Sequence, residues 1–202
     1  MLSLNKNKLL IGYTSRFGPL TNDLAEAFSF LFSKIEIDNR FNDTDTDRRK
    51  LAYCLATFKW ETAHTMRPID ERGGDAYFNK RYNPLNSVGK MLGNTKTGDG
   101  ALYHGRGYVQ LTGRNNYARA KKFTGVDLIS EPDRAKEPEL AYQIAIQGMT
   151  DGWFTGRKLA NYFVGDTADY FNARKIINSL DQADKIADIA RSYSEILRES
   201  KG

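Results

Sequence analysis

The pattern of hydrophobic and polar positions predicts helices over most of the chain. Apolar residues recur at i, i+4, i+7, i+8 and i+11 from Leu24 to Ile35, a stripe typical of an amphipathic helix, and Thr21 precedes it as an N-cap. A second stripe runs from Leu51 to Phe58 and continues towards Glu61. Further helices are expected from residues 115–116 to 123, from residue 138 to about 152, around residues 170–177 and over residues 184–197.

The remaining stretches predict loops and a single small sheet. Residues 42–47 form a polar loop that ends in a helix cap, and residues 73–100 are rich in Gly and Asn, which favours loops with at most a short hairpin. Residues 108–112 alternate with period two and predict a short strand. We therefore expect an α+β, predominantly α-helical fold in which residues 1–202 form one domain without a separate second module.

Amino-acid composition limits the classes of partner and of fold but does not identify one partner. The 202 residues include 30 Lys and Arg against 25 Asp and Glu, a net charge of +5 that mildly favours an anionic partner. The single cysteine excludes an intramolecular disulfide, and no apolar stretch approaches the ~18 residues of a membrane span. The first residues are too polar for a secretory signal.

Carboxylates in the middle of the chain suggest acid–base chemistry. Glu61 falls at the flank of the apolar stripe of its helix, and partial desolvation raises the pKa of a carboxyl group, as a general acid requires. A second carboxylate is offered by Asp70, Glu71 or Asp75. Glycoside hydrolysis needs such a pair, one protonated and one ionised. The residues alone leave the choice of the second carboxylate open.

The Gly-framed block from Gly105 to Gly113 adds polar groups. Gln110 and Thr112 share one face of the predicted strand, where an amide and a hydroxyl could hold a water molecule and a sugar N-acetyl group. Exposed strand polarity explains them about equally well. Several aromatic residues could line the floor of a sugar cleft, although aromatic residues are more often core: Tyr103, Tyr108, Tyr117, Trp60 and Trp153.

Metal or thiol chemistry is not expected. Cys54 and His64 are ten residues apart on one predicted helix, roughly 15 Å along its axis, whereas zinc ligands lie at about 2.0–2.3 Å from the metal. No Gly pattern of a nucleotide-binding loop follows a strand. We expect no metal and no cofactor.

The chain resembles glycoside hydrolase family 19, the chitinase family that also includes many bacteriophage endolysins. The resemblance covers roughly residues 45–190 and rests on four blocks: Glu61-Thr62, Glu71-Arg72-Gly73, the run from Tyr103 to Gly113 followed by Asn115-Asn116-Tyr117, and Ile177-Asn178-Ser179. Two positions depart from the family pattern. Trp60 stands where His is usual, and Ser179 stands where Gly is usual.

The resemblance implies an α-rich, lysozyme-like fold and an inverting reaction. It assigns Glu61 as general acid, Glu71 as general base and Thr112 as the hydroxyl that helps hold the attacking water. The residues expected to bind substrate are Tyr103, Arg106, Gln110, Asn116, Tyr117 and Asn178.

From these features we expect a phage-type endolysin that hydrolyses β-1,4 bonds of peptidoglycan, as lysozymes do. Small size, basic charge and the lack of chitin-binding cysteine modules favour this interpretation. The alternative is a chitinase acting on β-1,4-linked N-acetylglucosamine, and a third hypothesis is an inactive glycan-binding module. We expect a monomer without nucleic acid or stable membrane association. It would be made in the host cytoplasm and would reach the wall through a holin.

Overall fold

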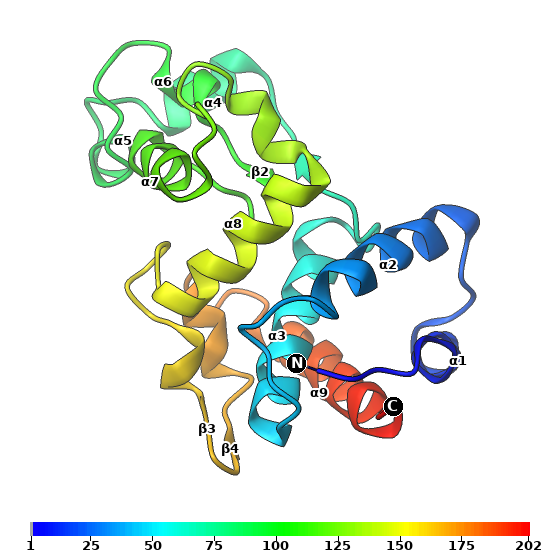
Figure 1. The fold of residues 1–202 in the computed structure, drawn as a ribbon. Helices are drawn as coiled ribbons and strands as arrows, with labels where there is room; N and C mark the ends of the chain where they lie inside the picture. Colours follow the sequence, from blue (N-terminus) through cyan, green and yellow to red (C-terminus); the bar gives the residue numbers. More distant parts are fainter. Residues whose placement is uncertain (1) are drawn as a thin grey trace. The chain divides into compact units, whose positions relative to one another are not determined.

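The computed structural model describes residues 2–202, and their contacts divide the chain into two compact units (Figure 1). The first unit contains residues 2–66 and 148–202. The second unit contains Arg67–Gln147. Candidate residues occur in both units, Glu61 in the first and Glu71 in the second. The prediction of a single catalytic domain remains a prediction.

The first unit is built on two long helices that pack along each other, α3 (Asp45–Glu61) and α9 (Ala183–Glu199), seen in cyan and red in Figure 1. Helix α1 (Lys6–Phe17) packs on α9, and α2 (Asn22–Ile35) begins at its Thr21 cap, whose side chain accepts a hydrogen bond from the Leu24 amide. The smaller elements are 3₁₀ helices η2 (Leu159–Asn161) and η3 (Asn172–Ile176) and the hairpin β3 (Phe163–Val164) with β4 (Thr167–Ala168).

Helix α3 is the central element of this unit, and it presents Glu61 at its end. Every residue from Leu51 to Lys59 is buried, so neighbours surround this part of the helix. The helix stops after Glu61 because the chain turns into left-handed backbone conformations at Ala63, with φ of 50°, and His64, with φ of 68°. Glu61 therefore belongs to a helix that packing fixes rather than to a loop.

The second unit is organised around a short antiparallel pair, β1 (Ile69–Asp70) and β2 (Arg106–Gly107), in which Asp70 faces Arg106. Three short helices lie between these strands: α4 (Asp75–Arg81), α5 (Ser87–Met91) and α6 (Asp99–Leu102). After β2 come α7 (Arg114–Thr124), η1 (Pro132–Lys136) and α8 (Pro138–Asp151), whose last residues belong to the first unit.

The predicted fold class is confirmed, since the chain is mostly helical with small sheets. Residues 73–100, predicted as loops, instead contain three short helices. The strand predicted over 108–112 was wrong, because residues 108–110 form the turn of a hairpin closed by a bridge between Arg106 and Leu111. Tyr108, Val109 and Leu111 are all buried, so the alternation in sequence does not correspond to alternating burial.

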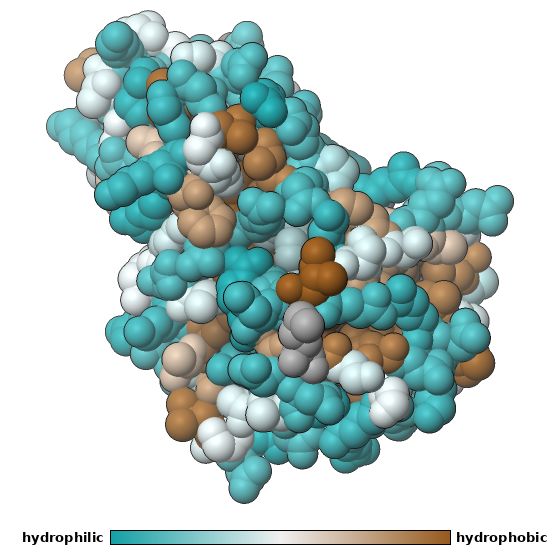
Figure 2. Space-filling model, viewed as in Figure 1, coloured by the Kyte–Doolittle hydropathy of each residue, from teal (hydrophilic) through white to brown (hydrophobic). Residues whose placement is uncertain are grey.

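Three further elements differ from expectation. The helix expected around residues 170–177 is the 3₁₀ helix η3, while α1 and the β3–β4 hairpin carry no pattern that predicted them. The face drawn in Figure 2 is largely hydrophilic, with scattered hydrophobic residues. Among residues 2–202, no helix combines the length and the apolar character that crossing a membrane requires.

Asp99 bonds to residues on both sides of the block from Gly105 to Gly113, namely Thr95 and Lys96 before it and Arg114 after it. Its side chain, in a residue only 2% exposed, accepts hydrogen bonds from the backbone N–H groups of Thr95 and Lys96 and pairs with Arg114 at 2.6 Å. Burial alone would raise the pKa of Asp99, but the Arg114 guanidinium and these N–H groups lower it to about 2.

Asp99→Asn is expected to lower the free energy of unfolding by about 3 kcal/mol at neutral pH, because Arg114 loses its buried partner. The folded-state pKa is depressed, so the contribution of Asp99 is complete above the ordinary Asp pKa near ~4 and is lost as the pH falls through about 2. Urea unfolding of the wild type and of Asp99→Asn should show a difference in the free energy of unfolding that narrows over this pH range. A difference in the free energy of unfolding that stays constant with pH would contradict the stabilising role of the ionised Asp99 carboxylate.

Candidate active site

Glu71 lies directly after β1 and is bound twice to Gly105. Its backbone N–H donates to the Gly105 carbonyl at 2.7 Å, and its Oε2 accepts from the Gly105 N–H at 3.0 Å. The Tyr82 hydroxyl donates to Oε1 at 2.8 Å. Both carboxylate oxygens of Glu71 therefore have a neutral hydrogen-bond donor.

Gly105 also brings Glu71 together with two other predicted residues. A Cβ added to Gly105 would lie 2.8 Å from Gln110 Oε1, 3.1 Å from Glu71 Oε2 and 3.2 Å from Thr112 Oγ1. The three oxygens thus border the position over the glycine that a side chain would otherwise occupy. The Thr112 hydroxyl donates to the Gln110 carbonyl at 2.8 Å, which fixes its orientation. The sequence expectation that Gln110 and Thr112 act together agrees with this geometry, although a turn rather than a strand positions them.

Asp70 belongs to a different cluster from its neighbour Glu71. Its carboxylate contacts Lys136 at 2.6 Å, His104 at 3.3 Å and Arg106 at 3.4 Å. Burial acts to raise the pKa of Asp70, but hydrogen bonds and charge from Lys136, together with His104 and Arg106, lower it overall. Asp70 is therefore an anion held among cations, and its environment is that of a structural ion cluster.

Three residues predicted to bind substrate lie in the core of the second unit. Tyr103 is 1% exposed, Tyr117 is 0% exposed and Arg106 is 5% exposed. Arg106 donates to the Tyr117 hydroxyl at 2.9 Å and to Asp133 at 3.0 Å, so it joins the hairpin to α7 and η1. These placements argue against direct contact with a sugar, because buried rings and a buried guanidinium hold the loop in place instead.

Asn116 is the remaining predicted residue in the second unit. Its side-chain amide donates to the Thr112 carbonyl at 2.9 Å, and the residue is half-buried. Asn116 therefore supports the backbone of Thr112 and still has accessible surface.

Glu61 has an ion-pair partner that the sequence did not reveal. Its Oε1 lies 2.5 Å from Nη1 of Arg174, and the side chains are 15% and 4% exposed respectively. Nε of Arg174 donates to the Asp181 carbonyl at 3.1 Å, which anchors the guanidinium. The apolar flank expected around Glu61 thus includes a buried cation. The two residues are 113 positions apart in the chain, so no local pattern in the sequence links them.

The first unit also contains two other predicted residues, Asn178 and Trp60. Asn178 is exposed, and its backbone N–H donates to the Arg174 carbonyl at 3.0 Å. Trp60, next to Glu61, is half-buried and has the Lys185 ammonium 5.7 Å from its ring centroid. A tryptophan ring covered by an ammonium group has one face occupied, which limits the face that could stack on a sugar.

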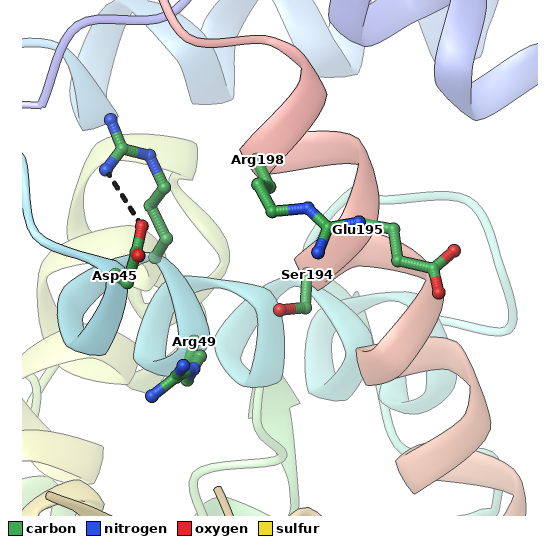
Figure 3. A pocket seen from close by; sticks show the side chains of 6 residues that line it. Asp45, Arg49, Ser194, Glu195 and Arg198 are labelled. Atoms are coloured by element: carbon green, nitrogen blue, oxygen red, sulfur yellow. Dashed lines mark ion pairs between the residues drawn. The ribbon is translucent and has the colours of Figure 1, made fainter. Parts of the chain in front are cut away.

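Two cavities contain none of Glu61, Glu71 and Thr112. Figure 3 shows the cavity in the first unit, of about 180 Å³, between Asp45 and Arg49 on α3 and Ser194 and Arg198 on α9. A larger cavity of about 1080 Å³ in the second unit is lined by polar residues that include His104 and Arg106. Among residues 2–202, no three His, Cys, Asp or Glu side chains are grouped to hold a metal ion.

Comparison with protein families identifies the class of the chain. The family model of glycoside hydrolase family 19, chitinase class I, matches residues 30–158. This chain belongs to glycoside hydrolase family 19. The family is one of glycoside hydrolases. The matched range includes Glu61, Glu71 and Thr112 but neither Arg174 nor Asn178.

Curated relatives match shorter stretches. An endochitinase of Arabidopsis thaliana is 44% identical over 48 residues, 23% of this chain and 17% of the relative. A family 19 domain-containing protein of Haemophilus influenzae is 43% identical over 54 residues, 27% of this chain and 26% of the relative. Endochitinase 2 of Gossypium hirsutum is 30% identical over 107 residues, 51% of this chain. The chain spans only about a sixth to about a third of the length of these relatives.

Solved structures support the fold over nearly the whole chain. Chitinase C of Streptomyces griseus superimposes with a TM-score of 0.65 at 19% identity, covering 98% of this chain and 94% of that one. A bacterial family 19 chitinase gives 0.61 at 20% identity, with coverage of 96% and 94%. At such identities the likeness establishes the fold alone.

Gly105→Ala is expected to keep the fold and to reduce turnover by about 10-fold or more. The added methyl group would press on Glu71 Oε2, Gln110 Oε1 and Thr112 Oγ1, and small displacements of reacting groups are costly. Initial rates on one polymer, with circular dichroism as the test of folding, check this prediction.

Gly74→Ala is the matched control. Gly74 lies near Glu71 in the chain, has an extended backbone with φ of −119° and has open space where the Cβ would be placed. The Gly74→Ala variant should be as active as the wild type. If Gly105→Ala is as active as Gly74→Ala, the space over Gly105 is not used in catalysis.

Proposed function

We propose that this chain hydrolyses β-1,4 bonds between N-acetylated amino sugars, with Glu61 as general acid and Glu71 as general base. The observation that carries the proposal is the space over Gly105, which the oxygens of Glu71, Gln110 and Thr112 face together. A water molecule held there has a carboxylate to accept its proton and two polar groups to orient it. This is the arrangement that an inverting hydrolysis requires on the side of the base.

The proposed reaction is a single displacement. The water oxygen bonds to the anomeric carbon while one of its protons passes to Glu71, and the bond to the leaving sugar breaks. The oxygen of that sugar takes the proton carried by Glu61. Arg174 holds Glu61 by Oε1, so we assign the transferred proton to Oε2.

The contrast between Glu71 and Asp70 supports the choice of base. Asp70 contacts the cations Lys136 and Arg106, which stabilise its negative charge, and it also contacts His104. A carboxylate held in this way is a weak proton acceptor. Glu71, held by neutral donors, is the better base.

Chitin-type chains of N-acetylglucosamine are the substrate that the relatives support. Endochitinases of two plants match parts of the chain, and chitinases from bacteria share its fold. Asn116, which is half-buried, and Asn178, which is exposed, are the residues we assign to contacts with the acetamido sugars. We assign Gln110 to binding both the attacking water and the acetamido sugar.

Peptidoglycan is the second candidate, and charge favours it. Residues 67–147 contain 13 Lys and Arg against 9 Asp and Glu, so the unit with Glu71 carries most of the net charge of +5. The peptide stems of peptidoglycan carry carboxylates, which such a surface attracts. The proposals of a phage endolysin, of a monomer and of holin-dependent release rest on this second candidate.

Substitution of the carboxylates tests the mechanism. Glu61→Gln and Glu71→Gln should each keep the fold and lose at least ~10²-fold in turnover, the usual scale of general acid–base catalysis. Asp70→Asn, the matched control, should retain most activity and lose some stability, because it removes a partner of Lys136. Initial rates on one polymer at one pH make the comparison. Loss of activity in Asp70→Asn with retention in Glu71→Gln would move the base to Asp70.

The choice of polymer is tested by salt. Hydrolysis of uncharged colloidal chitin should be nearly independent of ionic strength. Any action on purified peptidoglycan should weaken as salt rises, since the Debye length falls from about 10 Å at 0.1 M to about 3 Å at 1 M. Mass spectrometry of released fragments identifies the bond. Clearing of bacterial walls at low salt without release from chitin would replace the first candidate by the second.

A further inference from the structure

The support of the Glu71 carboxylate extends beyond the residues that face the candidate water. Oε2 accepts from the Gly105 N–H, a donor fixed by the backbone. Oε1 accepts at 2.8 Å from the hydroxyl of Tyr82, eleven residues further along the chain. Without the second bond, the carboxylate could rotate about its last side-chain torsion, because sp³–sp² torsions are broad.

Tyr82 is itself held from several directions. The residue is 7% exposed, and its ring lies parallel to that of Phe78, with centroids 6.4 Å apart. Its backbone carbonyl accepts from the Asn94 side chain at 2.9 Å. Burial raises the pKa of the Tyr82 hydroxyl, and the neighbouring Glu71 carboxylate raises it further, so the group remains a donor at working pH.

Arg81 fixes the direction of that donor. Its Nε donates to the Tyr82 oxygen at 3.2 Å, and its guanidinium lies 5.6 Å from the centroid of the Tyr82 ring. With Arg81 donating to the oxygen, the hydroxyl hydrogen of Tyr82 is directed to Glu71. Arg81 also donates to the hydroxyl of the exposed Tyr77 at 3.2 Å.

We infer that Tyr82, oriented by Arg81, is a positioning residue that fixes the Glu71 carboxylate for activation of water. The inference rests on the proposed role of Glu71 as base. Tyr82 does not touch the space over Gly105 and acts through Glu71. Its hydrogen bond has two consequences, since it holds the carboxylate in place and also favours the ionised form that a base must have.

Tyr82→Phe tests the inference, because it removes one hydroxyl and keeps the buried ring. Turnover should fall about 10- to 100-fold with little change in KM, since the substrate still binds but the carboxylate is no longer fixed. Loss of a hydrogen bond to the ionised form favours protonation. The acidic limb of the pH–kcat profile should therefore move to higher pH, which a purely structural role of Tyr82 would not cause.

Tyr77→Phe is the matched control. It removes a hydroxyl that contacts the same Arg81 but not Glu71, from a residue that is 47% exposed. Its kcat and pH profile should match the wild type. Kinetics use glycol chitin or solubilised peptidoglycan, whichever the wild-type enzyme degrades faster, with thermal unfolding of each variant in parallel.

The outcomes separate the inference from the proposed function. An inactive Glu71→Gln with a fully active Tyr82→Phe and an unmoved acidic limb would overturn the inference and leave the base in place. Equal losses in Tyr82→Phe and Tyr77→Phe would also overturn it, because only Tyr82 touches Glu71. An active Glu71→Gln would overturn the proposed function, and the inference with it.

Discussion

The two hydrogen bonds between Glu71 and Gly105 fix the geometry on which the second unit's site depends. One joins the backbones at the end of the β1–β2 pair, and the other joins the Gly105 N–H to the Glu71 carboxylate. Because the same glycine has no side chain, the oxygens of Gln110 and Thr112 approach the same space. A two-residue strand pair is too small to be stable alone. It persists here because buried Arg106 joins the hairpin to Tyr117 and Asp133.

The neighbouring carboxylates Asp70 and Glu71 belong to two different clusters. Asp70 meets Arg106, His104 and Lys136, whereas Glu71, one residue later, faces the space over Gly105. Consecutive residues in extended chain point to opposite sides, so a shift by one residue would exchange the two roles. The register between Asp70 and Arg106 thus determines which carboxylate is available to a water molecule.

Local patterns in the sequence predicted the helices better than the contacts of the site. The apolar stripes of α2, α3 and α9 recur with the helical period because each helix buries one broad face or more. Helices of four to seven residues, such as α4, α5 and α6, are too short to show a period. The pairing of Glu61 with Arg174 depends on α3 and η3 meeting in space, which no local spacing encodes. The contact between Tyr82 and Glu71 depends on tertiary packing for the same reason.

The two carboxylates are held by groups of different charge. Glu71 receives neutral donors on both oxygens, which leaves it an acceptor in a fixed orientation. Glu61 receives one buried cation on Oε1, and Oε2 accepts no hydrogen bond from the described part of the chain. An arginine on one oxygen stabilises the carboxylate that remains after a proton has left. In the proposed mechanism the proton of Glu61 is therefore assigned to Oε2, the oxygen that Arg174 does not contact.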